Sequence, residues 1–477
     1  MAGSAAQPKA IAHETVAERQ AKGKRQRETV PLSWHSQLEL APDRDPVGLL
    51  ESQAASRVQE LVPIRYGRML ESPFAFYRGA ALPMAADLSH TPTTTLLETQ
   101  LCGDAHLSNF GAFGAPDRRL VFDVNDFDET HPGPFEWDVK RLAASVEIAG
   151  RVNGYKPRKR REAVLATVES YRTHMRRLSK RDNLDVWYER IEYESILEYA
   201  RGAIGEAAWQ RLVSAASKAT SRNSIQVLGK LTQIVDGEPR FVATPPLLVP
   251  LRDLVPEGDE RTDEELIAWL RQMMRRYRTS LQYDRRILLE QFRLVDAARK
   301  VVGVGSVGTR AWVLLMLGRD NDDPLFLQAK EAQQSVLAPY VETTHRFRNE
   351  GERVVAGQHI MQAASDIFLG SLRANGADGF QRDFYVRQLR DWKMSANPSI
   401  MEPETMLAYG AVCGRSLARA HARGGDRIAI ASYLGSSDKF DVAVAEFASR
   451  YADVTEADHA ALAAAAESGR ITAERGL

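Results

Sequence analysis

Leu101-Cys-Gly-Asp-Ala-His-Leu-Ser-Asn-Phe110 and, one predicted hairpin later, Phe122-Asp-Val-Asn-Asp-Phe-Asp-Glu129 are the most informative stretches of this chain. Asp104 stands five residues before Asn109, on a predicted loop that enters a short strand. Phosphoryl transfer requires such residues, because a carboxylate orients the attacking hydroxyl while an amide oxygen and a second carboxylate hold Mg²⁺. The two stretches therefore predict one half of a phosphoryl-transfer site.

The Asp104 segment resembles the Gly-Asp-x-His-x-x-Asn loop of the aminoglycoside-phosphotransferase branch of the protein-kinase-like fold. The resemblance implies that Asp104 accepts the proton of the attacking hydroxyl and that Asn109 holds Mg²⁺. Asp126 resembles the aspartate of the Asp-Phe-Gly motif, which makes it the expected main metal ligand. Asp123 lies nearer the usual spacing from Asn109, and Asp128 lies two residues beyond Asp126, so both remain alternatives. A plain turn, in which Asp and Asn cap backbone groups, is the competing interpretation.

A second motif lies some two hundred residues downstream, in Gly303-Val-Gly-Ser-Val-Gly308. Strands are predicted on both sides of it, at 301–304 and 311–317, after a helix at 284–298, and a hairpin then leads to Lys330 at a strand end. This order resembles the small lobe of a kinase, in which a glycine loop covers the phosphates and a strand lysine pairs with them. It implies nucleotide contacts from Gly303, Gly305, Ser306, Gly308 and Lys330. A solvated strand end is the alternative for the lysine.

Several neighbouring residues have weaker expected roles. The carboxylate that orients Lys330 is expected from Glu331, Glu350 or Glu352, among which the sequence does not choose. Asp138 resembles the helix aspartate that braces a catalytic loop, and His106 is expected to support that loop rather than to bind metal. A separate group of arginines, Arg65, Arg68 and Arg78, lies upstream and is expected to meet phosphate or an acidic substrate, or else to form salt bridges on helical faces.

Kinase-like proteins place the small lobe before the catalytic loop, whereas this chain has the reverse order. Leu389-Arg-Asp-Trp-Lys393 resembles the hinge over the adenine, which makes Leu389 an expected nucleotide contact. Tyr409–His421 resembles the helix that normally leads into the catalytic loop. A circular permutation between that helix and the loop explains the order, and surface breaks of this kind are tolerated. It predicts that residues 422–426 lie beside the segment entering Gly103, and that Lys330 faces residues 123–128 across one cleft.

The same motif combination is similar to that of a bacterial family of uncharacterised proteins, DUF2252, over roughly residues 50–460. The resemblance implies an α+β, two-lobed, protein-kinase-like fold that is circularly permuted. Its large lobe is expected to be mostly helical and its small lobe to be a five-stranded antiparallel sheet. The expected organisation is a mobile tail at 1–45, a catalytic lobe at 46–300, a nucleotide-binding lobe at 301–393 and C-terminal helices at 394–477.

Composition limits the setting. The chain has 477 residues, and its 63 Lys and Arg balance its 63 Asp and Glu, which indicates neither nucleic acid nor an anionic membrane as a partner. Two cysteines do not form a disulfide framework, and no apolar run has the length of a membrane span. We therefore expect a cytoplasmic protein.

The expected function is an ATP- and Mg²⁺-dependent phosphotransferase with an unidentified hydroxyl acceptor. A small molecule is favoured over a protein, because the Asp-Phe-Asp stretch lacks the glycine of protein kinases. The alternatives are a nucleotide-binding pseudokinase without turnover, a nucleotidyl transferase on the same fold, and an NAD-dependent oxidoreductase using Gly303–Gly308. The last is disfavoured, because a strand rather than a helix is predicted after the glycines.

Overall fold

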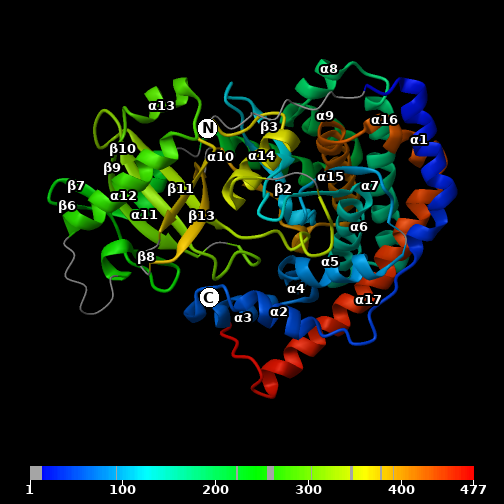
Figure 1. The fold of residues 1–477 in the computed structure, drawn as a ribbon, viewed down its shortest axis with the longest axis horizontal. Helices are drawn as coiled ribbons and strands as arrows, with labels where there is room; N and C mark the ends of the chain where they lie inside the picture. Colours follow the sequence, from blue (N-terminus) through cyan, green and yellow to red (C-terminus); the bar gives the residue numbers. More distant parts are fainter. Residues whose placement is uncertain are drawn as a thin grey trace, which may run out of the picture.

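The computed structural model describes residues 13–92, 94–221, 224–254, 263–301, 303–343, 347–375, 379–389 and 392–476. Helices gather on one side of the molecule and a large sheet lies on the other (Figure 1). The fold is thus α+β, as the sequence predicts at this coarse level.

Four long helices form the centre of the helical side. They are α6 (Phe135–Val152), α7 (Pro157–Leu178), α15 (Pro403–Gly424) and α17 (Lys439–Glu467). Helix α6 is buried along nearly its whole length, which marks it as a core helix rather than an amphipathic surface helix. The surrounding helices are α1 (Val16–Thr29), α2 (Pro46–Ala54), α3 (Val62–Met69), α4 (Pro73–Gly79), α5 (Ala81–His90), α8 (Asn183–Tyr188), α9 (Tyr193–Ala203), α10 (Glu206–Ser221) and α16 (Arg427–Leu434).

The large sheet is antiparallel throughout and has six strands in the order β12-β13-β11-β10-β9-β8. The strands are β8 (Leu248–Pro250), β9 (Arg293–Lys300), β10 (Ala311–Leu317), β11 (Pro324–Ala332), β12 (Gly370–Asn375) and β13 (Gln381–Gln388). Helices α11 (Ser224–Leu231), α12 (Asp263–Arg278), α13 (Tyr283–Leu289) and α14 (Glu350–Met361) accompany it, as does the hairpin β6 (Thr232–Val235) and β7 (Glu238–Phe241).

The start of this sheet differs from the prediction. Residues 301–304 were expected to form the first strand, but that strand is β9, which ends at Lys300. The helix expected over 284–298 ends at Leu289. The expected count of five strands is also wrong, because β8 adds a sixth at the edge beside β9.

Two small sheets support the Asp104 loop. β1 (Glu98–Leu101) pairs with β4 (His131–Pro134), and the second sheet has the order β14-β2-β3-β5. Its strands are β2 (Phe110–Gly114), β3 (Leu120–Val124), β5 (Ile191–Glu192) and β14 (Met394–Ser395). Phe110 pairs with Val124, so the hairpin brings the end of the Asp104 loop beside the start of the acidic stretch.

The N-terminal segment is not the mobile tail that the sequence suggested. Helix α1 lies along α16, where Arg19 forms a 2.8 Å ion pair with Asp426 and the Arg27 Nε donates to the Tyr433 carbonyl. Gly23 fits against the backbone of α16 without room for a side chain. The expectation of a tail is therefore wrong for residues 13–45, and its first twelve residues lie outside the described chain.

The end of α15 lies against β1, as the permutation predicts. The Thr99 hydroxyl donates to the His421 carbonyl at 2.9 Å, and Gly424 and Gly425 pack on Gln100 and Thr99. The segment after α15 and the segment that enters Gly103 are therefore neighbours in space.

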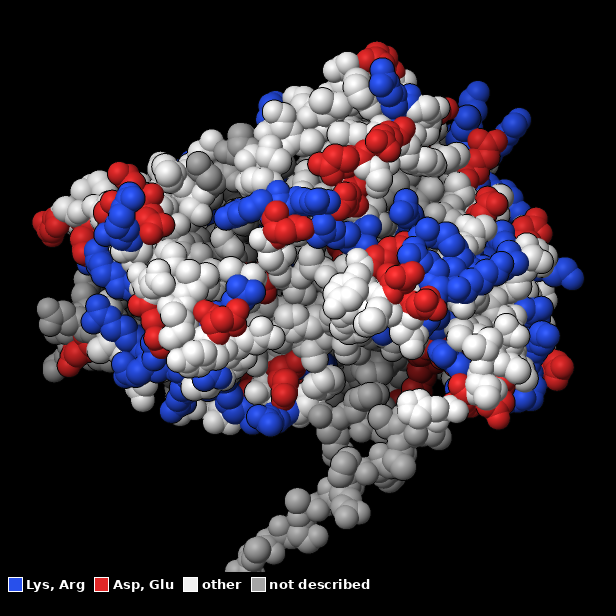
Figure 2. Space-filling view, turned by 90° about the horizontal axis from the view of Figure 1, so that it is seen from above, with Lys and Arg blue, Asp and Glu red and all other residues white. Residues whose placement is uncertain are grey.

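The exposed surface mixes both charges. Lys and Arg lie interspersed with Asp and Glu on the face drawn in Figure 2. None of the described helices combines the length and the apolar character needed to cross a membrane.

Candidate active site

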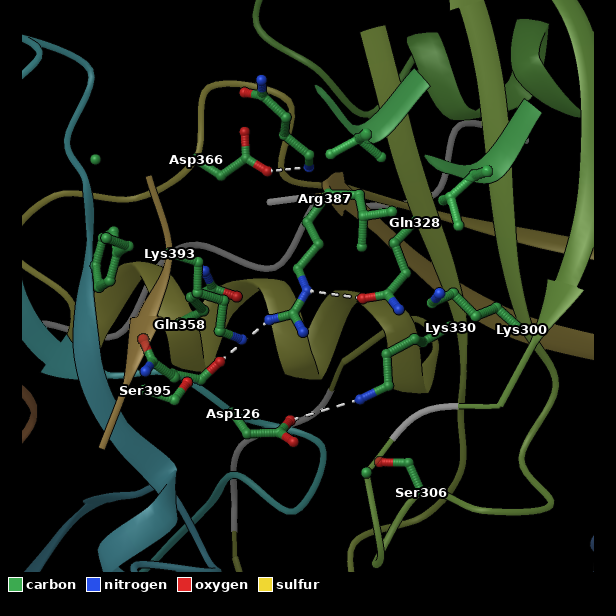
Figure 3. A pocket seen from close by; sticks show the side chains of 18 of the residues that line it. Asp126, Lys300, Ser306, Gln328, Lys330, Gln358, Asp366, Arg387, Lys393 and Ser395 are labelled. Carbon is green, nitrogen blue, oxygen red and sulfur yellow. Dashed lines mark hydrogen bonds and ion pairs between the residues drawn. The ribbon is translucent and has the colours of Figure 1, made fainter. Parts of the chain in front are cut away.

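A cavity of about 1030 Å³ lies between the large sheet and the acidic stretch. Figure 3 shows side chains from β11, β13 and the acidic stretch pointing into it. Asp126 and Lys330 line it side by side (Figure 3), and Gly303 and Ser306 line it as well. We call this space the first cavity.

Lys330 and the acidic stretch meet directly. The Lys330 Nζ lies 3.6 Å from Asp126 Oδ1 and 2.5 Å from Asp128 Oδ2. Lys330 pairs across the sheet with Tyr385, and the Tyr385 hydroxyl donates to Asp128 Oδ1 at 2.6 Å. The expectation that Lys330 faces this segment across one cleft is confirmed.

The charges at this contact support one another. Burial opposes the charge of Lys330, but Asp126 and Asp128 outweigh it and raise the pKa of the lysine. Burial likewise disfavours ionised Asp126, but Lys330, Arg387 and Lys393 outweigh it and lower the pKa of that carboxyl. Both groups are therefore charged at neutral pH, as a phosphate contact and a metal ligand require.

None of the three expected glutamates forms an ion pair with Lys330 in the described structure. Glu331 pairs with Arg310 at 3.1 Å, and Glu350 pairs with Arg353 at 2.5 Å. Glu352 instead accepts the backbone N–H of Arg348. The partner of Lys330 is Asp128, which the sequence had offered only as an alternative metal ligand.

The glycine loop separates the first cavity from a second one. Gly303 and Gly308 have φ angles of 62° and 88°, a left-handed conformation that favours glycine. A side chain at Gly305 would approach the Arg78 carbonyl to 3.2 Å. Ser306 lines both cavities, and its hydroxyl lies 3.4 Å from Asp128 Oδ2. The loop is thus held close to the acidic stretch.

Part of the lining of the first cavity is apolar. Leu389, Val227, Leu231 and Leu248 line it and belong to one hydrophobic cluster. The Leu389 N–H donates to the Phe326 carbonyl at 2.8 Å and so continues the β11–β13 pairing. These residues can contact a flat apolar ring, whereas Lys330 suits phosphate.

Asp104 and Asn109 lie in the second cavity, which has a volume of about 510 Å³. The two cavities share Asp126, Gly303 and Ser306 and therefore meet at the acidic stretch. The Asn109 amide nitrogen donates to the Asp104 carbonyl at 2.8 Å and approaches the Asp126 carbonyl at 3.4 Å. These contacts orient the amide and leave its oxygen as the atom that a metal can use.

Helix α6 fixes the Asp104 loop from behind. Asp138 accepts the backbone N–H groups of Cys102 at 2.8 Å and Gly103 at 3.1 Å, and it contacts His421 of α15. Its expected bracing role is thus confirmed. One turn later, Arg141 lies 2.6 Å from Asp104 Oδ1. Arg141 was not among the residues predicted from the sequence, although its spacing of three residues from Asp138 places both on one helix face.

His106 and Asp123 support the loop without lining a metal site. His106 is buried, and burial lowers its pKa to about 4, so it is neutral beside Asp104 at neutral pH. Asp123 is buried under α15, where both of its oxygens lie 2.6 and 2.7 Å from Arg419. Asp123 lines neither cavity, so we remove it from the expected metal ligands.

The donors present fit Mg²⁺ only as part of a shared site. Among the described residues, no three His, Cys, Asp or Glu side chains gather into a ready-made metal site. Asp126 and Asn109 line the same cavity, where a carboxylate and an amide oxygen could hold such an ion. Mg²⁺ is commonly held by one or two protein oxygens together with water and substrate phosphates, which matches this set.

The family model described as "Uncharacterized protein conserved in bacteria (DUF2252)" matches residues 57–465. No curated protein matches the chain. No solved structure matches it either.

Proposed function

We propose that this chain, which belongs to the DUF2252 family of uncharacterised bacterial proteins, is an ATP- and Mg²⁺-dependent phosphotransferase acting on a hydroxyl group. The observation that carries the proposal is the meeting of Lys330, Asp126 and the glycine loop around one cavity, although the chain separates them widely. Asp104 lies in the adjoining cavity. These are the parts that phosphoryl transfer needs.

We further propose a circularly permuted protein-kinase-like fold. Three contacts support it. Helix α15 ends beside β1, and Asp138 of α6 accepts hydrogen bonds from the backbone of the Asp104 loop. Leu389, directly after β13, donates its N–H to the Phe326 carbonyl of β11. Each is the contact expected if the sheet, the hinge and the catalytic loop keep their places while the chain order changes. The sixth strand, β8, and the N-terminal helices are additions to that scheme.

Each residue then has a defined task. Lys330 and the backbone of Gly303–Gly308 hold the phosphates, and the apolar residues around Leu389 hold the base. Asp126 and Asn109 hold Mg²⁺, which when bound neutralises phosphate charge, while ATP supplies the transferred group. Asp104 orients the acceptor hydroxyl and takes its proton as the hydroxyl oxygen bonds to the γ-phosphorus of ATP, while the bond from that phosphorus to the β–γ bridging oxygen breaks and ADP leaves. Arg141 keeps the Asp104 carboxylate in place.

Nucleotide binding requires one exchange of partners. In this structure Asp128 forms an ion pair with Lys330 and also accepts hydrogen bonds from Tyr385 and Ser306. For Lys330 to contact phosphate, that ion pair has to open or be shared. The glycine loop also contacts Asp128 through Ser306, so the same change frees the loop to cover the nucleotide.

The proposal is tested with the purified chain, Mg²⁺ and either γ-labelled or α-labelled ATP in a small-molecule extract. We expect transfer of the γ-label alone, and we expect chelation of Mg²⁺ to abolish it. Asp104→Asn should lower turnover about 100-fold or more and leave ATP affinity nearly unchanged, because Asp104 acts on the acceptor. Lys330→Ala should weaken nucleotide binding as well, because it removes a phosphate contact.

Other outcomes identify the alternatives. Transfer of the α-label would mean nucleotidyl transfer, and tight ATP binding without transfer would mean a pseudokinase. Equal loss of ATP affinity in Asp104→Asn and Lys330→Ala would contradict the role given to Asp104. Arg415→Gln is a suitable control, because Arg415 lines neither cavity.

A further inference from the structure

The second cavity has features that the phosphotransfer roles above do not explain. It is formed by the Asp104 loop, the glycine loop, residues 331–339 and the segment from α2 to α4. Three arginines of that last segment, Arg57, Arg65 and Arg78, line it. Their side chains come from an N-terminal region to which the phosphotransfer roles above assign no residue.

These arginines are buried with incomplete hydrogen bonding. Arg57 is 6% exposed and Arg65 is 0% exposed. The Nε atom of each of the three guanidinium groups is buried without a hydrogen-bond partner among the described residues, as is Nη1 of Arg65. Arg57 donates to the Val307 carbonyl at 2.5 Å and Arg65 to the Gly79 carbonyl at 3.0 Å, both uncharged partners.

None of the three forms an ion pair with a described carboxylate, whereas three acidic groups of the cavity already have other cationic partners. Asp104 pairs with Arg141, Asp128 with Lys330 and Glu331 with Arg310. Glu129 has no cationic partner within ion-pair distance among the described residues, and burial raises its pKa to about 7. The positive charge of the three arginines is therefore left over.

Because the three arginines are buried, their unpaired positive charge is unfavourable without a counter-charge. Burial and the nearby Arg57 lower the pKa of Arg65, and burial lowers the pKa of Arg57 to about 10. Unpaired buried charges are costly, and guanidinium groups bind planar or tetrahedral oxyanions through several N–H groups at once. An anion in this cavity would supply the missing counter-charge to the guanidinium groups that line it and would separate the like charges of Arg57 and Arg65.

We propose that the second cavity binds an acceptor that carries an oxyanion, a phosphate ester or a carboxylate, beside the hydroxyl that is phosphorylated. Arg57, Arg65 and Arg78 hold the oxyanion while Asp104 faces the hydroxyl; this assignment of the hydroxyl rests on the proposed phosphotransferase function. A cavity of about 510 Å³ suits a small molecule rather than a folded protein surface. The substrate class is thus a small hydroxylated phosphate or carboxylate.

Arg78 gives the cleanest test, because it makes no hydrogen bond or ion pair with any residue that the structure describes. The full-length protein is titrated calorimetrically, without nucleotide, with inorganic phosphate, glycerol 3-phosphate, glycerate and neutral glycerol. We expect the anions to bind and glycerol not to bind. Arg78→Gln should weaken anion binding about tenfold or more, whereas Arg78→Lys should retain most of it.

Arg415→Gln is the matched control, since Arg415 is also partly buried with an unpartnered Nε but lies outside both cavities. It should bind anions like the wild type. Equal affinity in Arg78→Gln and wild type, or binding of no anion by the wild type, would overturn the proposal. Stronger binding of glycerol 3-phosphate than of glycerate would identify the oxyanion of the acceptor as a phosphate ester. Stronger binding of glycerate would identify it as a carboxylate.

Lys330→Ala separates this inference from the proposed function. It should impair ATP binding and transfer but weaken phosphate binding less than Arg78→Gln does, because Lys330 does not line the second cavity, although its partner Asp128 does. A loss of phosphate binding in Lys330→Ala larger than that in Arg78→Gln would place the anion in the first cavity and overturn the inference. Anion binding that depends on Arg78 in a protein without transfer activity would support the anion site while contradicting the phosphotransferase.

Discussion

Glu129 should make the stability of the protein depend on pH. Burial raises its pKa from 4.5 to about 7, so the folded protein keeps this proton over a range in which the unfolded chain loses it. Stability from this group is therefore full below about pH 4.5 and falls as the pH rises towards 7. Glu129→Gln, which resembles the protonated form, should raise the free energy of unfolding at pH 8 by up to about 3 kcal/mol and change little at pH 4.5.

Urea denaturation at the two pH values measures this effect. Glu162→Gln is the control, because Glu162 lies on the surface of α7, paired with Arg158. It should show no comparable difference between the two pH values. A stability difference for Glu129→Gln that is the same at pH 4.5 and pH 8 would show that Glu129 does not titrate as its burial indicates.

The residues of the site divide into those that local sequence reveals and those that only packing reveals. Asp104, Asn109 and Asp126 stand in recognisable loops, and the structure places all three in the second cavity. The partner of Lys330 could not be read from spacing, because Glu350 is taken by Arg353 within its own helix turn. Asp128 reaches Lys330 only through the meeting of two distant segments.

Among the elements, α6 acts as the support of the Asp104 loop. Asp138→Ala would leave the buried N–H groups of Cys102 and Gly103 without an acceptor, so we expect a loss of about 2–4 kcal/mol in stability. Turnover should fall in the proteins that remain folded. Asp185→Ala on α8 is the control, since its ion pair with Arg181 is exposed and should contribute less than about 0.5 kcal/mol.

Denaturation curves of both variants, recorded with activity at a temperature at which each is folded, check this expectation. A change in Asp138→Ala no larger than that in Asp185→Ala would contradict the bracing role. Normal turnover in Asp138→Ala would mean that the loop keeps its conformation without α6.

Element prediction succeeded where pairing and pattern agree, as in β3 and β10, whose bounds match the sequence expectation. It failed at β9, because Asp296-Ala-Ala-Arg-Lys300 has little local preference for strand and gains it from the neighbouring β10. It also failed at α1, whose buried residue is Gly23, so that hydrophobic periodicity gives no signal. Both misses arise from tertiary contacts.

In the molecule as a whole, the two halves of the chain complete each other's core. Helices α15 and α17 pack on α7 and α6, so residues from both ends of the chain share one hydrophobic cluster. Five of the six strands of the large sheet, β9 to β13, follow the exposed turn at Gln291, and only the short edge strand β8 precedes it. The packing of α15 and α17 against α6 and α7 therefore contributes more to holding the two parts of the molecule together than the chain connection at this turn does.

This arrangement predicts that residues 1–291 and 292–477, co-expressed as two chains, assemble into a complex that binds Mg·ATP. The exposed turn tolerates the break, whereas the buried helix contacts supply the association. Copurification through a tag on one fragment, followed by nucleotide titration, measures the outcome. A break after Glu169, in the middle of α7, is the control and should abolish assembly, because it interrupts a helix that packs along α15. Fragments split at Gln291 that fail to associate, or that associate without binding nucleotide, would show that the site depends on chain order rather than on where its parts lie.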